Sequence, residues 1–212
     1  MGNRKLINFK VIGYVIGSLL IINGFLMALP LGFSFYHDDG MQTSFILSSV
    51  ITLAVGFALR LFLKQYKEAE IKRREGFLIV SISWLAMTLF GTLPYVISES
   101  IPNFSNAFFE TMSGFTTTGA SILNDIEAVP KGVLFWRSLT HWIGGMGIIV
   151  LAVAILPLLG IGGMQLFAAE APGPSADKLH PRITDTAKRL WLIYFGYTAA
   201  ETILLKVAGM SF

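Results

Sequence analysis

Five long apolar stretches constrain the fold of this chain more than any other feature. They lie within Val11–Phe35, Met41–Leu63, Gly76–Ser98, Gly132–Leu159 and Leu190–Gly209. A helix of about 20 apolar residues is long enough to cross the ~30 Å hydrocarbon core of a bilayer. Only 14% of the 212 residues are charged, whereas a soluble domain carries about a quarter. We therefore predict an all-α integral membrane protein, with lipid around much of its surface.

The basic residues cluster between the apolar stretches and predict an orientation. Segment 37–42 contains no Lys or Arg, and segment 98–132 contains only Lys131. The positive-inside rule therefore places the N-terminus, residues 64–75 and residues 160–189 in the cytoplasm. The basic residues behind this prediction are Arg4, Lys5, Lys10, Lys64, Lys67, Lys72, Arg73, Arg74, Lys178, Arg182, Lys188 and Arg189. Because they interrupt apolar runs rather than follow one face, we expect no nucleic-acid partner.

The links predicted to be external carry acidic residues instead, namely Asp38, Asp39, Glu99, Asp125 and Glu127. Such acids beside a pore mouth would raise the local concentration of cations. They can equally be ordinary solvated loop residues, and the sequence leaves both interpretations open.

Segment 98–132 leaves and re-enters the membrane on the same side, yet it contains the apolar stretch Phe104–Phe115. Ser105 is a suitable N-cap, so we predict a short pore helix over residues 105–114. Ten helical residues cover about 15 Å, which is half of the membrane. An extended return strand, Phe115–Ser121, then leads back to the starting side. Non-helical backbone at that depth is tolerated only inside protein or along a watery cavity.

The return strand carries the residues that we predict to bind an ion: Thr116, Thr117, Thr118, Gly119 and Ala120. Rings of backbone carbonyls replace the hydration shell of K⁺ in potassium filters. Threonine adds a hydroxyl acceptor, and glycine permits a backbone conformation that other residues rarely adopt. The C-terminal end of the short helix carries partial negative charge, which favours a cation beside it. Thr-Thr-Thr-Gly alone is typical of a polar loop; its position after a half-depth helix favours a filter.

Glu110, Gly114 and Ser121 are predicted to support this filter. The Glu110 carboxylate either accepts hydrogen bonds from filter amides or faces trapped water. Glu201 is predicted to be a buried partner of a base or hydroxyl, and Arg137 and Lys206 are possible partners. Arg137 can equally extend to the membrane interface. We predict that His141 is a packed, hydrogen-bonded side chain and that Gly144, Gly145 and Gly147 serve close helix packing.

Three stretches together resemble the Trk/Ktr/HKT superfamily of potassium transporters, and most closely its TrkH-type membrane subunit. They are Ala107–Ser121, Phe135–Val150 and Gly162–Tyr194. The resemblance implies four helix–pore-loop–helix repeats around one pore in a longer polypeptide. The chain would then comprise two leading helices (1–70), a first pore repeat (71–160), a cytoplasmic connector (161–189) and the first helix of a second repeat (190–212). We expect it to be the N-terminal part of a TrkH-type subunit.

The same resemblance implies potassium uptake across a bacterial inner membrane, with K⁺ as the transported ion. It also implies a TrkA-type nucleotide-binding regulatory subunit on the cytoplasmic face, the remaining repeats of the transporter, and a homodimer. Ala168 stands where a basic residue is expected, which weakens docking through that segment. One pore loop supplies one arc of each carbonyl ring, so this chain alone is not expected to carry a selective current. The alternatives are a non-conducting membrane scaffold and a membrane enzyme. We expect no catalytic residue, cofactor or other metal, because no convergent polar cluster is evident.

Overall fold

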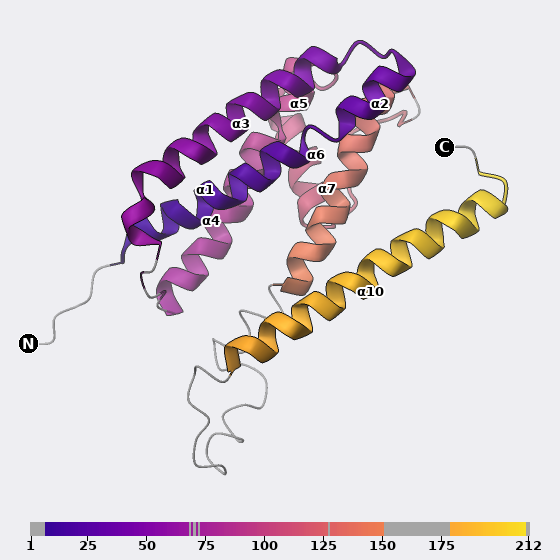
Figure 1. Cartoon of the computed structure of the whole chain (residues 1–212). Coiled ribbons are helices and arrows are strands. Elements are labelled where there is room, and N and C mark those ends of the chain that lie inside the picture. The colour runs from indigo at the N-terminus through magenta and orange to yellow at the C-terminus, as the bar shows by residue number, and fades with distance from the viewer. Residues whose placement is uncertain are drawn as a thin grey trace, which may run out of the picture. The chain divides into compact units, whose positions relative to one another are not determined.

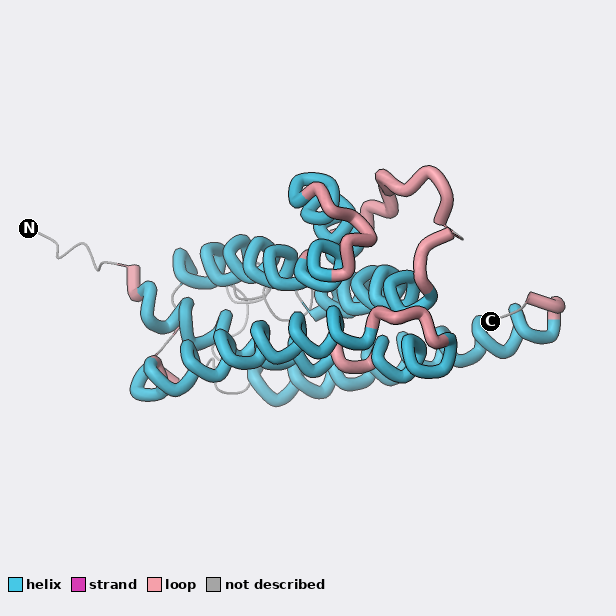
Figure 2. The backbone as a smooth tube through the Cα atoms, turned by 90° about the horizontal axis from the view of Figure 1, so that it is seen from above, coloured by secondary structure: helices cyan, strands magenta, loops and turns pink. Residues whose placement is uncertain are grey.

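The computed structural model is all-helical over the residues that it describes, which are 7–67, 69, 71, 73–126, 128–150 and 179–210. Figure 1 shows the order of the helices, and Figure 2 shows the backbone from above. The chain divides into two compact units, Met1–Gly144 and Gly145–Phe212. Four helices within the described residues are long and apolar enough to cross a membrane: Phe9–His37, Gln42–Phe62, Arg74–Ile97 and Asp185–Val207. The predicted all-α membrane fold is thereby confirmed.

The first predicted helix is interrupted in the structure. Helix α1 covers Phe9–Leu26, three turn residues follow, and α2 covers Pro30–His37. Proline has no backbone N–H, and its ring clashes with the carbonyl four residues earlier, so Pro30 starts a helix but cannot continue one. The two helices still form one span-length element.

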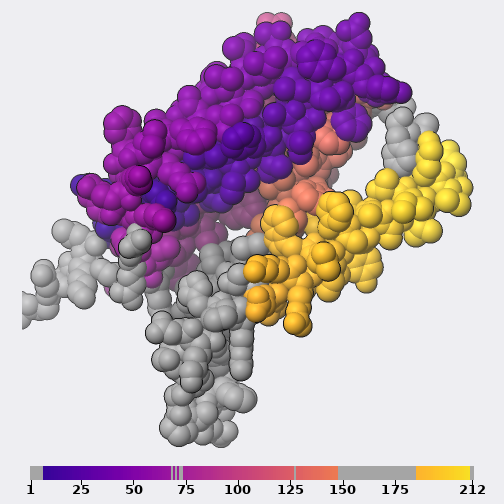
Figure 3. All heavy atoms as spheres, in the orientation of Figure 1, coloured from indigo at the N-terminus to yellow at the C-terminus, as the bar shows by residue number. Residues whose placement is uncertain are grey.

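Helix α3 (Gln42–Phe62) packs closely against α1 through glycines. A Cβ on Gly17 would lie 2.9 Å from Leu59 Cβ, and one on Gly56 would lie 2.9 Å from the backbone nitrogen of Ile21. Ser49 Oγ also donates to the carbonyl of Gly24 at 2.7 Å. Small residues and hydroxyls are what membrane helices use to approach each other. Figure 3 shows α1 and α3 side by side at the surface.

The predicted pore repeat starts with α4 (Arg73–Gly91) and the short α5 (Leu93–Ile97), which contains Pro94 in its first turn. Helix α6 covers Phe104–Phe115 and is capped by the side chain of Asn103, which accepts from the backbone of Asn106. The prediction of Ser105 as the N-cap was therefore wrong by two residues. Phe115 is helical, so the return segment starts at Thr116 rather than at Phe115.

Helix α7 (Lys131–Val150) follows the return segment. Its start lies at the same end of the first unit as the α2–α3 link, since Asp39 contacts Gly132 there. Ser100, which precedes α6, contacts Met41 in that link as well. At the opposite end, Asn8 bonds Glu75. The segment between α5 and α7 thus enters and leaves at one end of the unit.

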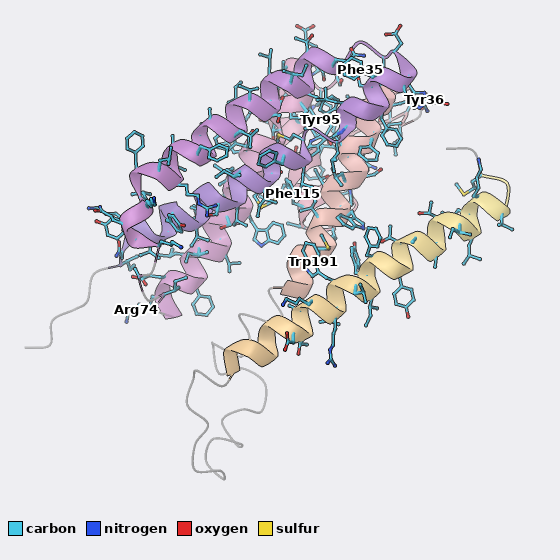
Figure 4. The ribbon with its side chains drawn as sticks, viewed as in Figure 1. Phe35, Tyr36, Arg74, Tyr95, Phe115 and Trp191 are labelled. Atoms are coloured by element: carbon cyan, nitrogen blue, oxygen red, sulfur yellow. The ribbon has the colours of Figure 1, made fainter. Side chains whose placement is uncertain are left out.

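A buried apolar cluster joins these helices: Met27, Phe45, Tyr95, Ile101, Ala107, Val133 and Trp136. Figure 4 shows the side chain of Tyr95 inside the bundle, whereas Phe35 and Tyr36 lie at the surface. Large apolar side chains such as Phe25, Val50 and Phe57 are exposed on α1 and α3. A row of exposed apolar side chains on span-length helices suits contact with lipid.

The second unit contains the last residues of α7 and helix α10 (Leu179–Val207), which begins before the predicted Leu190. A Cβ on Gly145 would lie 2.6 Å from the Tyr194 hydroxyl, so this glycine permits close packing. Within the described part of this unit Glu201 is exposed, which differs from its predicted burial. The apolar window of α10 around it is exposed as well. Residues 151–159 and most of the predicted connector 161–189 lie outside the described residues.

Candidate functional site

The C-terminal end of α6 is built as a Schellman motif. The amide of Thr118 donates to the carbonyl of Ser113 at 3.0 Å, and the amide of Thr117 donates to the carbonyl of Gly114 at 2.9 Å. In this motif the first residue beyond the helix cap has a left-handed backbone. That residue is Thr117, with φ +56°. A β-branched residue in that region is strained. Such strain persists only where surrounding contacts impose it, and it concentrates at functional sites.

The residues of this turn and those just after it have backbone carbonyl oxygens that accept no hydrogen bond from the described residues. Thr116, Thr117, Thr118 and Gly119 are exposed, and their carbonyls accept no hydrogen bond from the described part of the chain. The hydroxyls of Thr116 and Thr118 lie 2.8 Å apart. These oxygens follow directly on the negative end of the α6 dipole. A cation beside them would meet several oxygens that accept no hydrogen bond from the described residues.

Gly119 and Ala120 differ in the interactions that fix their backbone. Gly119 has φ +76°, and a Cβ built there would meet no atom within 4 Å. The requirement for glycine at this position is therefore a backbone requirement and not one of space. The carbonyl of Ala120, in contrast, accepts a hydrogen bond of 2.6 Å from Ser113 Oγ. Among the hydrogen bonds of the described residues, Ala120 is thus the one predicted ligand whose carbonyl accepts from α6.

Glu110 lies behind this segment, fully buried on α6. Its carboxylate accepts from the backbone nitrogen of Ile122 at 2.9 Å and from Ser121 Oγ at 3.1 Å. Arg137 Nε of α7 donates to the same carboxylate at 2.6 Å. The Glu110 side chain therefore links α6, the chain just beyond the predicted filter and helix α7.

The pairing of Glu110 with Arg137 was missed at the sequence level, where Arg137 was considered a partner of Glu201. The available signal was that segments 104–115 and 132–150 each contain one formal charge, of opposite sign. Charges in apolar segments are costly to leave alone in a membrane interior, so such a pair is a natural expectation.

Glycines let α6 and α7 approach each other at the C-terminal end of α6. A Cβ on Gly114 would collide with the side chain of Thr140, and one on Gly144 would collide with the carbonyl oxygen of Phe115. The ring of Phe115 in turn lies 2.8 Å from the Cβ position of Gly91. His141 Nδ1 lies 3.0 Å from the carbonyl of Arg137, so this ring is hydrogen-bonded within its own helix. No group of three possible metal-ligating side chains occurs among the residues described.

Several span-length helices, with the short helix α6 packed among them and the chain returning to the end from which it entered, define an all-helical, multi-span membrane protein. The family model described as "TrkH: Cation transport protein" matches residues 41–210. The chain therefore belongs to the TrkH family of cation transport proteins, which is a family of transporters and not of enzymes.

Individual relatives agree with this assignment. The chain is 46% identical over 206 residues to the Trk system potassium uptake protein TrkH of Salmonella typhimurium, covering 96% of this chain and 42% of that protein. It is 35% identical over 203 residues to TrkG of Escherichia coli, covering 95% and 42%. The crystal structure of the potassium transporter TrkH from Vibrio parahaemolyticus matches with a TM-score of 0.81 at 37% identity, over 97% of this chain and 41% of that one. The chain thus spans about two fifths of the length of these relatives.

Proposed function

We propose that this chain supplies one arc of a potassium-selective filter and serves potassium uptake across a bacterial inner membrane. The observation that carries the proposal is the set of unpaired carbonyls at Thr116, Thr117, Thr118 and Gly119, placed at the negative end of α6. The names of its relatives, which are potassium uptake proteins, support K⁺ as the ion. Further pore segments, contributed by the remaining repeats of the transporter, complete each ring of oxygens around the ion.

The ligand set in this proposal differs slightly from the one predicted from sequence. Thr116 to Gly119 bind the ion, and Ala120 marks the end of the filter, because its carbonyl is engaged by Ser113. Glu110, Gly114 and Ser121 support this segment. Glu110 accepts hydrogen bonds from Ser121 and Ile122, and Gly114 leaves room for the side chain of Thr140 on α7. The partners proposed with this function are lipid, a TrkA-type regulatory subunit on the cytoplasmic face and a second copy of the transporter.

The test is a Gly119→Ser substitution in the assembled transporter, with potassium and sodium uptake measured in proteoliposomes. A side chain at φ +76° disfavours the native backbone, so the preference for K⁺ over Na⁺ should fall. Gly209→Ser is a matched control, because Gly209 has φ +90° and equally open surroundings but follows α10 and belongs neither to the predicted filter nor to the α2–α3 link. Unchanged selectivity in Gly119→Ser, or an equal loss in Gly209→Ser, would contradict the proposal and favour the scaffold alternative.

A further inference from the structure

The link between α2 and α3 is hydrogen-bonded to the first turn of α7. Asp39 Oδ2 accepts from the backbone nitrogen of Gly132 at 2.7 Å, across 93 residues of sequence. The first amides of a helix have no partner within the helix. A carboxylate that accepts from one of them satisfies that donor and places its negative charge at the positive end of the helix dipole. Asp39 thus caps α7 from a different part of the chain.

The carboxylate of Asp39 is itself held in place. Its Oδ1 accepts from the hydroxyl of Ser34 and from the backbone nitrogen of Met41, the latter at 3.1 Å. Ser34 is in turn fixed by Gln42 Nε2, which donates to its carbonyl at 2.9 Å. Partial burial raises the pKa of Asp39, but the bonds from Ser34, Gly132 and Met41 and the nearby His37 outweigh it and hold that pKa below its ordinary value. Asp39 is therefore ionised at neutral pH.

The surfaces around this bond fit closely. A Cβ on Gly132 would lie 3.1 Å from Asp39 Oδ2 and 3.1 Å from the ring of Phe45, so the first turn of α7 sits directly against the link and α3. Beside it, the rings of Phe33 and Phe135 stack with centroids 4.1 Å apart and planes 19° apart. The leading helices and α7 therefore meet over a defined contact, with α2 and the start of α7 at the same end of the unit (Figure 1).

This contact lies on α7, the helix whose Arg137 bonds Glu110 behind the predicted filter. Arg137 follows Gly132 by five residues on α7 and bonds Glu110, which in turn accepts from Ile122. Between them, Trp136 Nε1 donates to the carbonyl of Gly91 at 3.0 Å in the buried core. A displacement of the first turn of α7 would therefore be transmitted to Arg137 and, through Glu110, to the chain just beyond Gly119.

We propose that Asp39 is a positioning residue for the filter, acting through the cap of α7 and the Arg137–Glu110 pair. This inference rests on the proposed function in that its transport readout is ion selectivity. It differs from the other role open to an external acid, which is to attract cations by charge alone. Positioning depends on the hydrogen bond to Gly132, whereas attraction depends only on the net charge.

The test compares Asp39→Ala, Asp39→Asn and Asp38→Asn in the assembled transporter. Asparagine caps helices about as well as aspartate. Asp39→Asn therefore removes the charge and keeps one acceptor oxygen for the Gly132 amide, while its amide nitrogen replaces the oxygen that accepts from Ser34 and Met41. Asp38 is exposed and sits at φ +49°, which asparagine tolerates, so Asp38→Asn removes the same charge from the neighbouring position without touching α7. The readouts are the K⁺/Na⁺ uptake ratio, the KM for K⁺ at low and high ionic strength, and hydrogen exchange of the Gly132 amide.

Positioning predicts that Asp39→Ala lowers the K⁺/Na⁺ ratio by roughly fivefold, the effect of one lost helix cap on an equilibrium. It also predicts faster exchange at Gly132. Asp38→Asn should stay near the parent protein, and Asp39→Asn should fall between Asp38→Asn and Asp39→Ala in both readouts. A salt-dependent rise in KM shared by Asp39→Asn and Asp38→Asn, without a selectivity change in Asp39→Ala, would overturn it.

Two further results keep the inference separate from the proposed function and from simple misfolding. If the parent protein moves no K⁺, the proposed function fails, but unchanged Gly132 exchange in Asp39→Ala would still be needed to refute the cap. If Asp39→Ala does not fold, Ser34→Ala removes only the hydroxyl that orients the carboxylate. It should shift selectivity in the same direction and by less, and an unchanged ratio would overturn the inference.

Discussion

The buried pair of Glu110 and Arg137 leads to a prediction whose size follows from the structure. The Glu110 side chain is fully buried and that of Arg137 is 17% exposed. Removing one partner of a buried pair typically costs about 3–5 kcal/mol, because the other charge stays buried without compensation. In Arg137→Met the Glu110 carboxylate would still accept from Ser121 and Ile122. We therefore expect the free energy of unfolding to fall by an amount near the lower limit, about 3 kcal/mol.

Replacing Glu110 instead of Arg137 should lower the free energy of unfolding by less. Glu110→Gln keeps the shape of the side chain and one acceptor oxygen, and the guanidinium left behind has partial access to its surroundings. We expect about 1.5–3 kcal/mol, the contribution of a hydrogen bond to a charged group. Because both changes break the same bond, the double variant should lose less than the sum of the two, by at least about 1 kcal/mol.

The assay is the free energy of unfolding of the purified transporter in mixed micelles, with the K⁺/Na⁺ uptake ratio as a second readout. Lys131→Met is the matched control, since it removes an exposed cation from the first turn of the same helix and should change stability by less than about 0.5 kcal/mol. If the effects of Glu110→Gln and Arg137→Met add within about 0.5 kcal/mol, the two residues are independent and the reasoning fails.

Two other predictions concern the ends of the bundle. The pKa of Asp39 is held below its ordinary value of 3.8, so its stabilising effect is complete above pH 3.8 and is lost as the pH falls through its lower folded-state pKa. Protection of the Gly132 amide should therefore be constant from pH 7 to pH 5 and fall only in stronger acid, and a loss beginning near pH 6 would implicate a group other than Asp39. The chain has no cysteine, so an impermeant thiol reagent outside intact cells should label Asp125→Cys and not Lys67→Cys, and the opposite pattern would invert the proposed orientation.

The limits of the helices were largely readable from the sequence. Apolar length predicted the spans, and Pro30 and Pro94 coincide with the two breaks that the structure introduces into predicted continuous helices. The short helix before Thr116 was also predictable, although its cap proved to be Asn103. These features depend on residues within a few positions of each other, because backbone hydrogen bonding, proline geometry and side-chain caps all act locally.

The sequence by itself thus determined that this chain crosses a membrane several times and that a threonine- and glycine-rich segment follows a short helix. Only the tertiary structure decided that Arg137 pairs with Glu110, that the Ala120 carbonyl bonds Ser113, and that Asp39 caps α7. The physical reason is that a charge or polar group in an apolar environment must find a partner, while its sequence position does not say which one. The partner is decided by how closely the helices approach, and here glycines at positions 114, 132 and 144 set that approach.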